Sequence, residues 1–237
     1  MTIAQARSGE PTGSDQQMWK TVDDYFSGAL IAADSALAQV ERVSEAAGLP
    51  AISVSAPQGK LLQLLVRCVR AHRVLEVGTL GGHSAVWMAR AIRRPGRLVT
   101  FELDPRHAEV ARANVDHAGV GDLVDIRVGP AAHGLRALLD EKPEPFDVVF
   151  IDADKASNSV YLDYAVRLGR PGTVIVVDNV VRGGRVLTAT DEGSEGVRRL
   201  VDMLANRADV DSVAIQTVGS RGYDGFILAV VTDDVRC

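Results

Sequence analysis

The chain of 237 residues is long enough for the core of one α/β domain, and its 46% apolar content is typical of soluble globular proteins. Its formal net charge is −5 and it has no clustered stripe of Lys and Arg, which argues against nucleic acid as the main partner. It has no apolar run of the ~18 residues that a membrane span needs, so we expect no membrane partner.

The N-terminal quarter is predicted to hold a tail and three helices. Residues 1–17 are polar, rich in Gly, Ser and Gln, and lack the apolar centre of a signal peptide, so we expect a disordered tail. Periodic apolar positions and helix-end signals predict helices at Val22–Ala33, Ser35–Ala47 and Pro57–Arg70. Cys68 falls in the apolar part of the third and is interpreted as a core thiol. With Cys237 as the second of two cysteines, a disulfide framework is not expected, and this favours a cytoplasmic location.

From Arg73 onwards, short β-branched runs alternate with helical segments. The predicted strands are Arg73–Val77, Arg97–Phe101, Val124–Val128, Phe146–Ile151, Thr173–Val177, Val213–Thr217 and Phe226–Val231. The predicted helices are Ser84–Ala91, Pro105–Ala118, Gly134–Asp140, Ser159–Leu168 and Ser194–Asn206. This alternation predicts an α/β fold with a mostly parallel sheet covered on both faces. The loop between the last two strands is too short for a helical crossover, so we expect that pair to be antiparallel.

No linker interrupts this pattern. We therefore expect a single domain over residues 18–237, with N-terminal helices in 18–72 and an α/β core in 73–237.

Acidic and amide side chains follow two of the buried strands. Asp152 and Lys155 come after the fourth strand, and Asp178 and Asn179 after the fifth. Because the carboxyl ends of adjacent parallel strands meet at one edge of a sheet, these side chains should converge. Three oxygen ligands favour a hard cation, with Mg²⁺ the first expectation and Ca²⁺ or Mn²⁺ as alternatives.

A glycine-rich turn follows the first strand of the predicted core. Glycines at 78, 81 and 82 allow close approach of the backbone to a ligand, and a helix follows. The dinucleotide fingerprint does not fit, because its second glycine would fall at Leu80. Glu102, at the end of the second strand, is placed to accept hydrogen bonds from ribose hydroxyls. Glu76, just before the glycines, suits a cationic group better than a pyrophosphate.

Five segments together carry a resemblance to a known family. They are Ser53–Gly59, Leu75–Ser84, Phe146–Lys155, Arg170–Gly172 with Asp178–Val180, and Gly222–Phe226. In this order and spacing, the chain resembles the cation-dependent O-methyltransferases that use S-adenosylmethionine, the group that includes catechol and caffeoyl-CoA O-methyltransferases. The resemblance covers roughly Val22 to Val231 and is strongest to small bacterial members. It implies a Rossmann-like class I methyltransferase fold with seven strands.

The resemblance also implies roles for individual residues. The implied cofactor-binding set is Val54, Glu76, Gly78, Ser84, Glu102, Gly129, Pro130, Ala131 and Asp152, with Ser84 near the cofactor's carboxylate. The implied metal ligands are Asp152, Asp178 and Asn179, and Lys155 is the implied general base. His83 stands where the family often has tyrosine, and we interpret it as a residue of the pocket wall. For Asp154 the sequence leaves three roles open: contact with the cofactor, an indirect role at the metal, and solvation.

The expected activity is methyl transfer from S-adenosylmethionine to one hydroxyl of a vicinal-dihydroxy aromatic, dependent on a divalent cation. The partners implied are a small phenolic acceptor and a second copy of the chain in a homodimer. Two alternatives remain open at this point. One is a nicotinamide-dependent oxidoreductase on a similar sheet, and the other is a cofactor-binding scaffold without catalysis.

Overall fold

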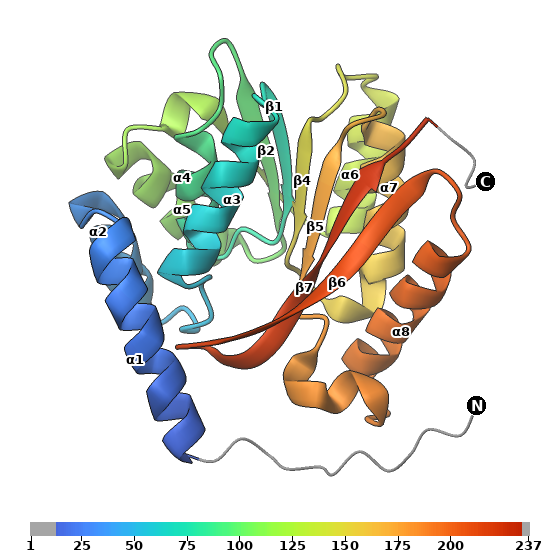
Figure 1. The fold of residues 1–237 in the computed structure, drawn as a ribbon. Coiled ribbons are helices and arrows are strands. Elements are labelled where there is room, and N and C mark those ends of the chain that lie inside the picture. The colour runs from blue at the N-terminus through green and yellow to red at the C-terminus, as the bar shows by residue number, and fades with distance from the viewer. Residues whose placement is uncertain (1–12, 234–237) are drawn as a thin grey trace.

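A seven-stranded sheet forms the centre of the molecule, in a computed structural model that describes residues 13–233 (Figure 1). The strands lie in the order β3-β2-β1-β4-β5-β7-β6. Strands from β3 to β5 pair in parallel, whereas β7 is antiparallel to both β5 and β6. Their bounds are β1 (Arg73–Val77), β2 (Arg97–Glu102), β3 (Val124–Val128), β4 (Val148–Ile151), β5 (Val174–Asp178), β6 (Val210–Gly219) and β7 (Gly222–Val231).

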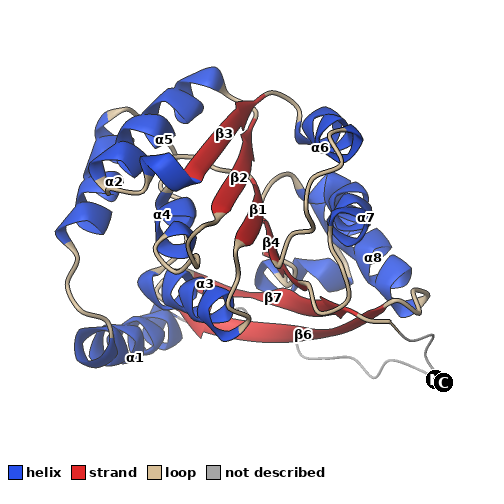
Figure 2. Ribbon diagram, turned by 90° about the horizontal axis from the view of Figure 1, so that it is seen from above, coloured by secondary structure: helices blue, strands red, loops and turns tan. Residues whose placement is uncertain are grey.

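Helices cover both faces of the sheet, which is the middle layer in Figure 2. Their bounds are α1 (Gly13–Leu30), α2 (Ser35–Ala46), α3 (Ala56–Cys68), α4 (His83–Ala89), α5 (Pro105–His117), α6 (Ala131–Asp140), α7 (Asn158–Leu168) and α8 (Glu192–Ala205). The alternation of side chains along β1 produces two cores. Val74 packs with α2 to α5, and Leu75 packs with α6 to α8. Both faces of the central strands are therefore buried, which explains their continuous apolar runs.

Local signals in the sequence start several of the helices. The Asp34 carboxylate accepts hydrogen bonds from the first turn of α2. Ser55 and Gln58 form a reciprocal capping box at the start of α3, and Asp104 caps α5 just before Pro105. These caps satisfy backbone N–H groups that no helical carbonyl can reach. They fix the residue at which each of these helices begins.

The predicted alternation, the parallel sheet and the antiparallel final pair are confirmed. The expected tail is wrong in part, because residues 13–17 belong to α1; residues 1–12 and Cys237 lie outside the described part. The final strands are longer than predicted and enclose a turn of only Ser220 and Arg221. The interpretation of Cys68 as a core thiol is wrong: it is exposed at the end of α3, because the buried side of this helix is formed by Gly59, Leu62, Gln63 and Val66.

No helix among residues 13–233 is long and apolar enough to cross a bilayer. The helix α1 lies along the outer edge of the molecule, beside the tip of the β6–β7 hairpin (Figure 1). A hydrogen bond of 2.7 Å from the Ser220 amide to Asp23 Oδ2 joins the two elements. This contact, 197 residues apart in sequence, closes one side of the edge where the strands end.

Candidate active site

Two adjoining cavities open at the carboxyl edge of the sheet. The first, about 730 Å³, lies over the ends of β1, β2 and β4. The second, about 860 Å³, lies under α1 and the β6–β7 hairpin and reaches the end of β5. Both are lined by Ile52, Ser53, Val54, Asp152 and Asn179. The shared wall makes the pair a cleft with two chambers, named here the β1 chamber and the hairpin chamber.

The turn after β1 brings the backbone against β4. Gly78 has φ +101°, and a Cβ atom there would lie 2.2 Å from the Asp152 carbonyl oxygen. Only glycine fits both that conformation and that approach. The turn thus places Asp152 directly beside the mouth of the glycine loop, in the wall common to both chambers.

Glu102 is held by two backbone N–H groups at the rim of the β1 chamber. Leu80 donates to Oε2 at 2.7 Å and Asp104 donates to Oε1 at 2.9 Å. His107 lies 3.6 Å from Oε1. The carboxylate therefore has a fixed orientation and still lines the cavity, as an acceptor for ligand hydroxyls must.

Glu76 is fully buried beneath the same chamber. Ser84 Oγ donates to Oε1 at 2.6 Å and Thr100 Oγ1 donates to Oε2 at 2.7 Å. Thr79 in turn pairs with Thr100 at 2.5 Å. Burial raises the pKa of Glu76 to about 7. The two hydroxyl donors oppose this shift, and the charges of Asp152 and Glu102 add to it. A cationic ligand group nearby would stabilise its ionised form.

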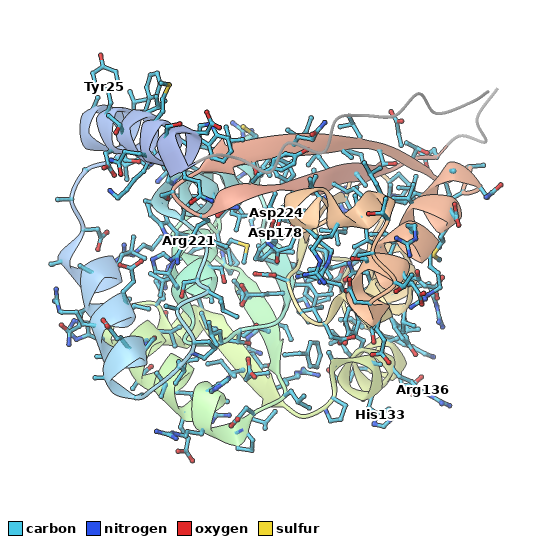
Figure 3. All side chains as sticks on the ribbon, turned by 90° about the horizontal axis from the view of Figure 1, so that it is seen from below. Tyr25, His133, Arg136, Asp178, Arg221 and Asp224 are labelled. Atoms are coloured by element: carbon cyan, nitrogen blue, oxygen red, sulfur yellow. The ribbon has the colours of Figure 1, made fainter. Side chains whose placement is uncertain are left out.

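An acidic centre lies where β4 and β5 end side by side. Asp178 is only 5% exposed, and burial together with the Asp152 carboxylate raises its pKa to about 7. Asn179 has φ +58° and donates its amide to Asp178 Oδ1 at 2.7 Å. Figure 3 shows Asp178 beside Asp224, a further negative charge that contributes to the same shift.

The donor set of this centre suits a hard cation. Asp152, Asp178 and Asn179 offer carboxylate and amide oxygens, and the two carboxylates repel one another in a buried setting. Within the described residues no group of three or more His, Cys, Asp or Glu side chains is arranged for a metal, so a cation at this centre would need the Asn179 amide oxygen as its third protein ligand. Oxygen-only donors fit Mg²⁺, Ca²⁺ or Mn²⁺ and do not suit zinc.

The amino group of Lys155 lies beside this centre. Lys155 Nζ donates to Asp152 Oδ1 at 2.8 Å, and the Lys155 side chain is 10% exposed. It lines the β1 chamber. Gly196 of α8 supports the loop from behind, because a Cβ there would lie 2.1 Å from the Lys155 carbonyl oxygen. The amino group is therefore held at the wall that divides the two chambers.

Asp154 has a positioning role in the same loop. Its carboxylate accepts hydrogen bonds from the Ser157 amide and from the Tyr161 hydroxyl. Burial alone would raise the pKa of Asp154. The two hydrogen-bond donors and the Lys155 charge outweigh the effect of burial, so the pKa is lowered overall. Asp154 is thus engaged by protein groups and holds the loop that carries Lys155.

Comparison with known proteins decides the family. The sequence model of the O-methyltransferase family matches residues 29–230. The chain belongs to the O-methyltransferase family. It is 50% identical over 221 residues to a catechol O-methyltransferase of Mycobacterium tuberculosis, covering 92% of this chain and 99% of the relative.

Solved structures agree in fold with this O-methyltransferase. An O-methyltransferase from Bacillus cereus in complex with SAH superposes with a TM-score of 0.90 at 49% identity, covering 92% of this chain and all of the other. TomG from Streptomyces achromogenes, involved in tomaymycin synthesis and solved with SAM, gives a TM-score of 0.89 at 49% identity, covering 92% and 99%. The expected Rossmann-like class I methyltransferase fold is confirmed.

Most of the site residues expected from the sequence gather in this cleft. Those that line the β1 chamber are Val54, Gly78, Ser84, Glu102, Pro130, Ala131, Asp152, Lys155 and Asn179. Asp178 lines the hairpin chamber. Glu76 lies one layer below the cavity surface, with Ser84 bonded to it. Gly129 is not among the lining residues, although its amide donates to the Glu102 carbonyl oxygen next to them.

Several residues of the cleft were not expected from the sequence. Tyr161 and His107 line the β1 chamber, and Arg221, Asp224 and Lys20 line the hairpin chamber. Tyr161 and His107 each lie in the first turn of the helix that follows a strand ending at the site, and this position in the sequence could have indicated that they line the cavity. The hairpin chamber was not predictable in this way, because it needs α1 and a hairpin about 200 residues away to meet.

The burial of Glu76 leads to a testable consequence for stability. Its pKa is 4.5 ordinarily and about 7 in the folded protein, so its contribution is fully present below the unfolded value and is lost as pH rises through the folded value. The variant Glu76→Gln mimics the protonated form. We expect the ligand-free variant to be more stable than the natural protein at about pH 8, by at most about 3 kcal/mol, and equal to it at about pH 4. Urea unfolding at the two pH values measures this; equal stability at both would contradict it.

Proposed function

We propose that this protein transfers a methyl group from S-adenosylmethionine to one hydroxyl of a vicinal-dihydroxy aromatic, with the help of a bound divalent cation, in the cytoplasm. The observation that carries the proposal is the common wall of the two chambers, where Asp152 and Asn179 face both. One chamber then holds the methyl donor and the other holds the acceptor. The relative named as a catechol O-methyltransferase supports the choice of acceptor. The structures solved with SAH or SAM support the choice of methyl donor.

The β1 chamber suits the methyl donor. Glu102 is oriented to accept the ribose hydroxyls, and Pro130 and Ala131 provide an apolar border for the adenine. Glu76, below Ser84, provides the negative charge that an ammonium group needs. Val54, in the loop before α3, closes the chamber from the side of the hairpin. The sulfonium methyl group would then face Asp152 and the hairpin chamber.

The acidic centre suits the acceptor end of the reaction. Asp152, Asp178 and Asn179 would hold the cation, and it would lower the pKa of a catechol hydroxyl and fix two vicinal oxygens beside the methyl donor. Lys155, at the dividing wall, would take the hydroxyl proton. Methyl transfer breaks the sulfur–methyl bond and forms an oxygen–methyl bond, leaving the demethylated cofactor, the methyl ether and one proton.

Mass spectrometry of acceptors tests the proposal. Incubation with S-adenosylmethionine, Mg²⁺ and a panel of catechols should give products heavier by one methylene, whereas the matching monophenols should not react. Equal reaction of monophenols and catechols would contradict the vicinal-dihydroxy part. Thermal shifts separate the alternatives: stabilisation by NAD but not by S-adenosylmethionine would favour the oxidoreductase, and binding with no turnover of any acceptor would favour the scaffold.

We also propose that the protein is a homodimer that pairs through α1. This helix has no buried residue, and Met18, Val22, Tyr25, Phe26 and Leu30 are all exposed on one broad side. Tyr25 is 71% exposed and points away from the body of the molecule in Figure 3. An apolar surface of this kind on an outer helix is typical of an interface. A second copy would bury it.

Light scattering after size exclusion tests the pairing. We expect a dimer for the natural protein and a monomer for the double variant Tyr25→Glu/Phe26→Glu, because two buried charges would oppose association. The variant Leu187→Glu changes a side chain outside α1 that is 77% exposed, and it should remain dimeric. A monomeric natural protein, or a dimeric double variant, would contradict the proposed interface.

A further inference from the structure

His83 is a buried side chain in the wall of the β1 chamber. It is the first residue of α4, directly before Ser84, and only 5% exposed. Its ring lies edge-to-face with Trp87, with centroids 6.5 Å apart. Trp87 packs in turn against Gly59 of α3, where a Cβ atom would lie 2.4 Å from the indole ring. The imidazole is therefore held between the helix core and the chamber.

The ring nitrogens of His83 lack hydrogen bonds within the described part of the chain. Nδ1 is buried with no partner, and Nε2 lies 3.7 Å from Glu41 Oε1, beyond hydrogen-bond distance. A buried polar atom without a partner is costly and rare. His83 lines the chamber, and a half-turn about the Cβ–Cγ bond exchanges Nδ1 with Cδ2 and Nε2 with Cε1, so it changes the direction in which each nitrogen points. The ring thus has hydrogen-bonding capacity that the described residues do not use.

The charges around His83 favour a neutral ring in the free protein. Burial lowers the pKa of His83, and the guanidinium of Arg221 in the hairpin turn lowers it further. The carboxylate of Glu41 on α2 acts in the opposite direction, but the net result is a lowered pKa. On α3, Lys60 lies over the Trp87 ring at 6.0 Å and adds positive charge nearby. On β1, Glu76 is separated from the ring by Ser84, to which it is bonded. A new negative charge in the chamber would change this balance.

The cofactor assigned to this chamber carries such a charge. We propose that His83 donates a hydrogen bond to the carboxylate at the methionine end of the bound cofactor, and that the complex holds a proton on this ring that the free protein lacks. The proposal rests on the proposed function for the identity of the ligand. It makes His83, beside Ser84, a residue through which cofactor affinity in this chain responds to pH.

Calorimetric titration with S-adenosylhomocysteine tests the proposal by counting protons. Heats of binding measured at about pH 7 in buffers of different ionisation enthalpy give the number of protons taken up. We expect the natural protein to take up more than the variants His83→Tyr and His83→Asn, by on the order of half a proton. The readout is the difference in proton uptake between the natural protein and the two His83 variants. Glu76 releases protons when the cofactor binds, and this release is common to all three proteins. The same variants should lose affinity up to ~10-fold more at about pH 6 than at about pH 8.

Two controls make the assignment specific. Glu41→Gln removes the other negative charge near the ring and should leave proton uptake in place; its loss in that variant would overturn the contact with the cofactor. Methylthioadenosine has no amino acid end and should show no uptake that depends on His83. Equal proton counts for the natural protein and both His83 variants would overturn the proposal while S-adenosylhomocysteine still binds. Absence of binding to the natural protein would instead overturn the proposed function and this proposal with it.

Discussion

Replacing Lys155 should reduce turnover by roughly 10²- to 10⁴-fold, the usual contribution of a general base. The informative variant is Lys155→Arg, because arginine keeps a positive charge beside Asp152 and cannot lose its proton near neutral pH. In the natural protein Lys155 Nζ donates to Asp152 Oδ1 at 2.8 Å, a pairing that arginine can reproduce. If Lys155 is the base, Lys155→Arg should be nearly as inactive as Lys155→Met. Steady-state rates with a catechol acceptor measure the loss.

The control for both Lys155 variants is the binding of S-adenosylhomocysteine. Its thermal shift should persist, since the residues assigned to the ribose and adenine, Glu102, Pro130 and Ala131, are untouched. Turnover by Lys155→Arg close to the natural rate would show that the charge of this side chain matters and its proton does not. The role of general base would then have to be withdrawn.

Replacing Asp178 should be nearly as damaging, through the loss of a metal ligand. The variant Asp178→Asn keeps the shape of the side chain and an oxygen that can accept from the Asn179 amide, but removes one negative charge. We expect a loss of activity of at least ~10²-fold at a Mg²⁺ concentration that saturates the natural protein, with partial recovery in excess Mg²⁺. Rates measured against Mg²⁺ concentration show the shift.

The same substitution should not destabilise the protein without metal. Asp178 is buried beside Asp152, and burial together with that neighbouring charge disfavours its ionised form in the folded state and raises its pKa to about 7. The control is Asp23→Asn, which removes a carboxylate from the wall of the same hairpin chamber, away from the strand ends. That variant should keep the natural dependence on Mg²⁺. An unchanged dependence in Asp178→Asn would remove this residue from the proposed ligand set.

The sheet and its site edge were predictable because the signals are local. The runs before Asp152 and Asp178 are β-branched and uninterrupted, as strands buried on both faces must be. Parallel pairing then brings their carboxyl ends together, whatever the loops do. The close approach at Gly78 follows from the same pairing, because the turn after β1 has to pass the end of β4.

Other features depended on contacts distant in sequence. Gly13–Gln17 reads as a polar tail, yet these residues form the first turns of α1, which the hairpin tip holds through Asp23. Glu76 was expected in the cavity wall, but Ser84 and Thr100 bond to its oxygens in a layer beneath it. Asp154 could not be assigned from sequence, since its role depends on Tyr161 returning to it after one turn of α7. Each outcome is set by tertiary packing.

The most direct test of the central claim is methyl transfer to a catechol with and without metal. Protein treated with EDTA and freed of chelator should bind S-adenosylhomocysteine as before but give no methylated product, and addition of Mg²⁺ should restore the full rate. That result would support a cation at Asp152, Asp178 and Asn179, between the two chambers. Full activity in excess EDTA would contradict the account, because methyl transfer would then need no cation bound by the side chains at these strand ends.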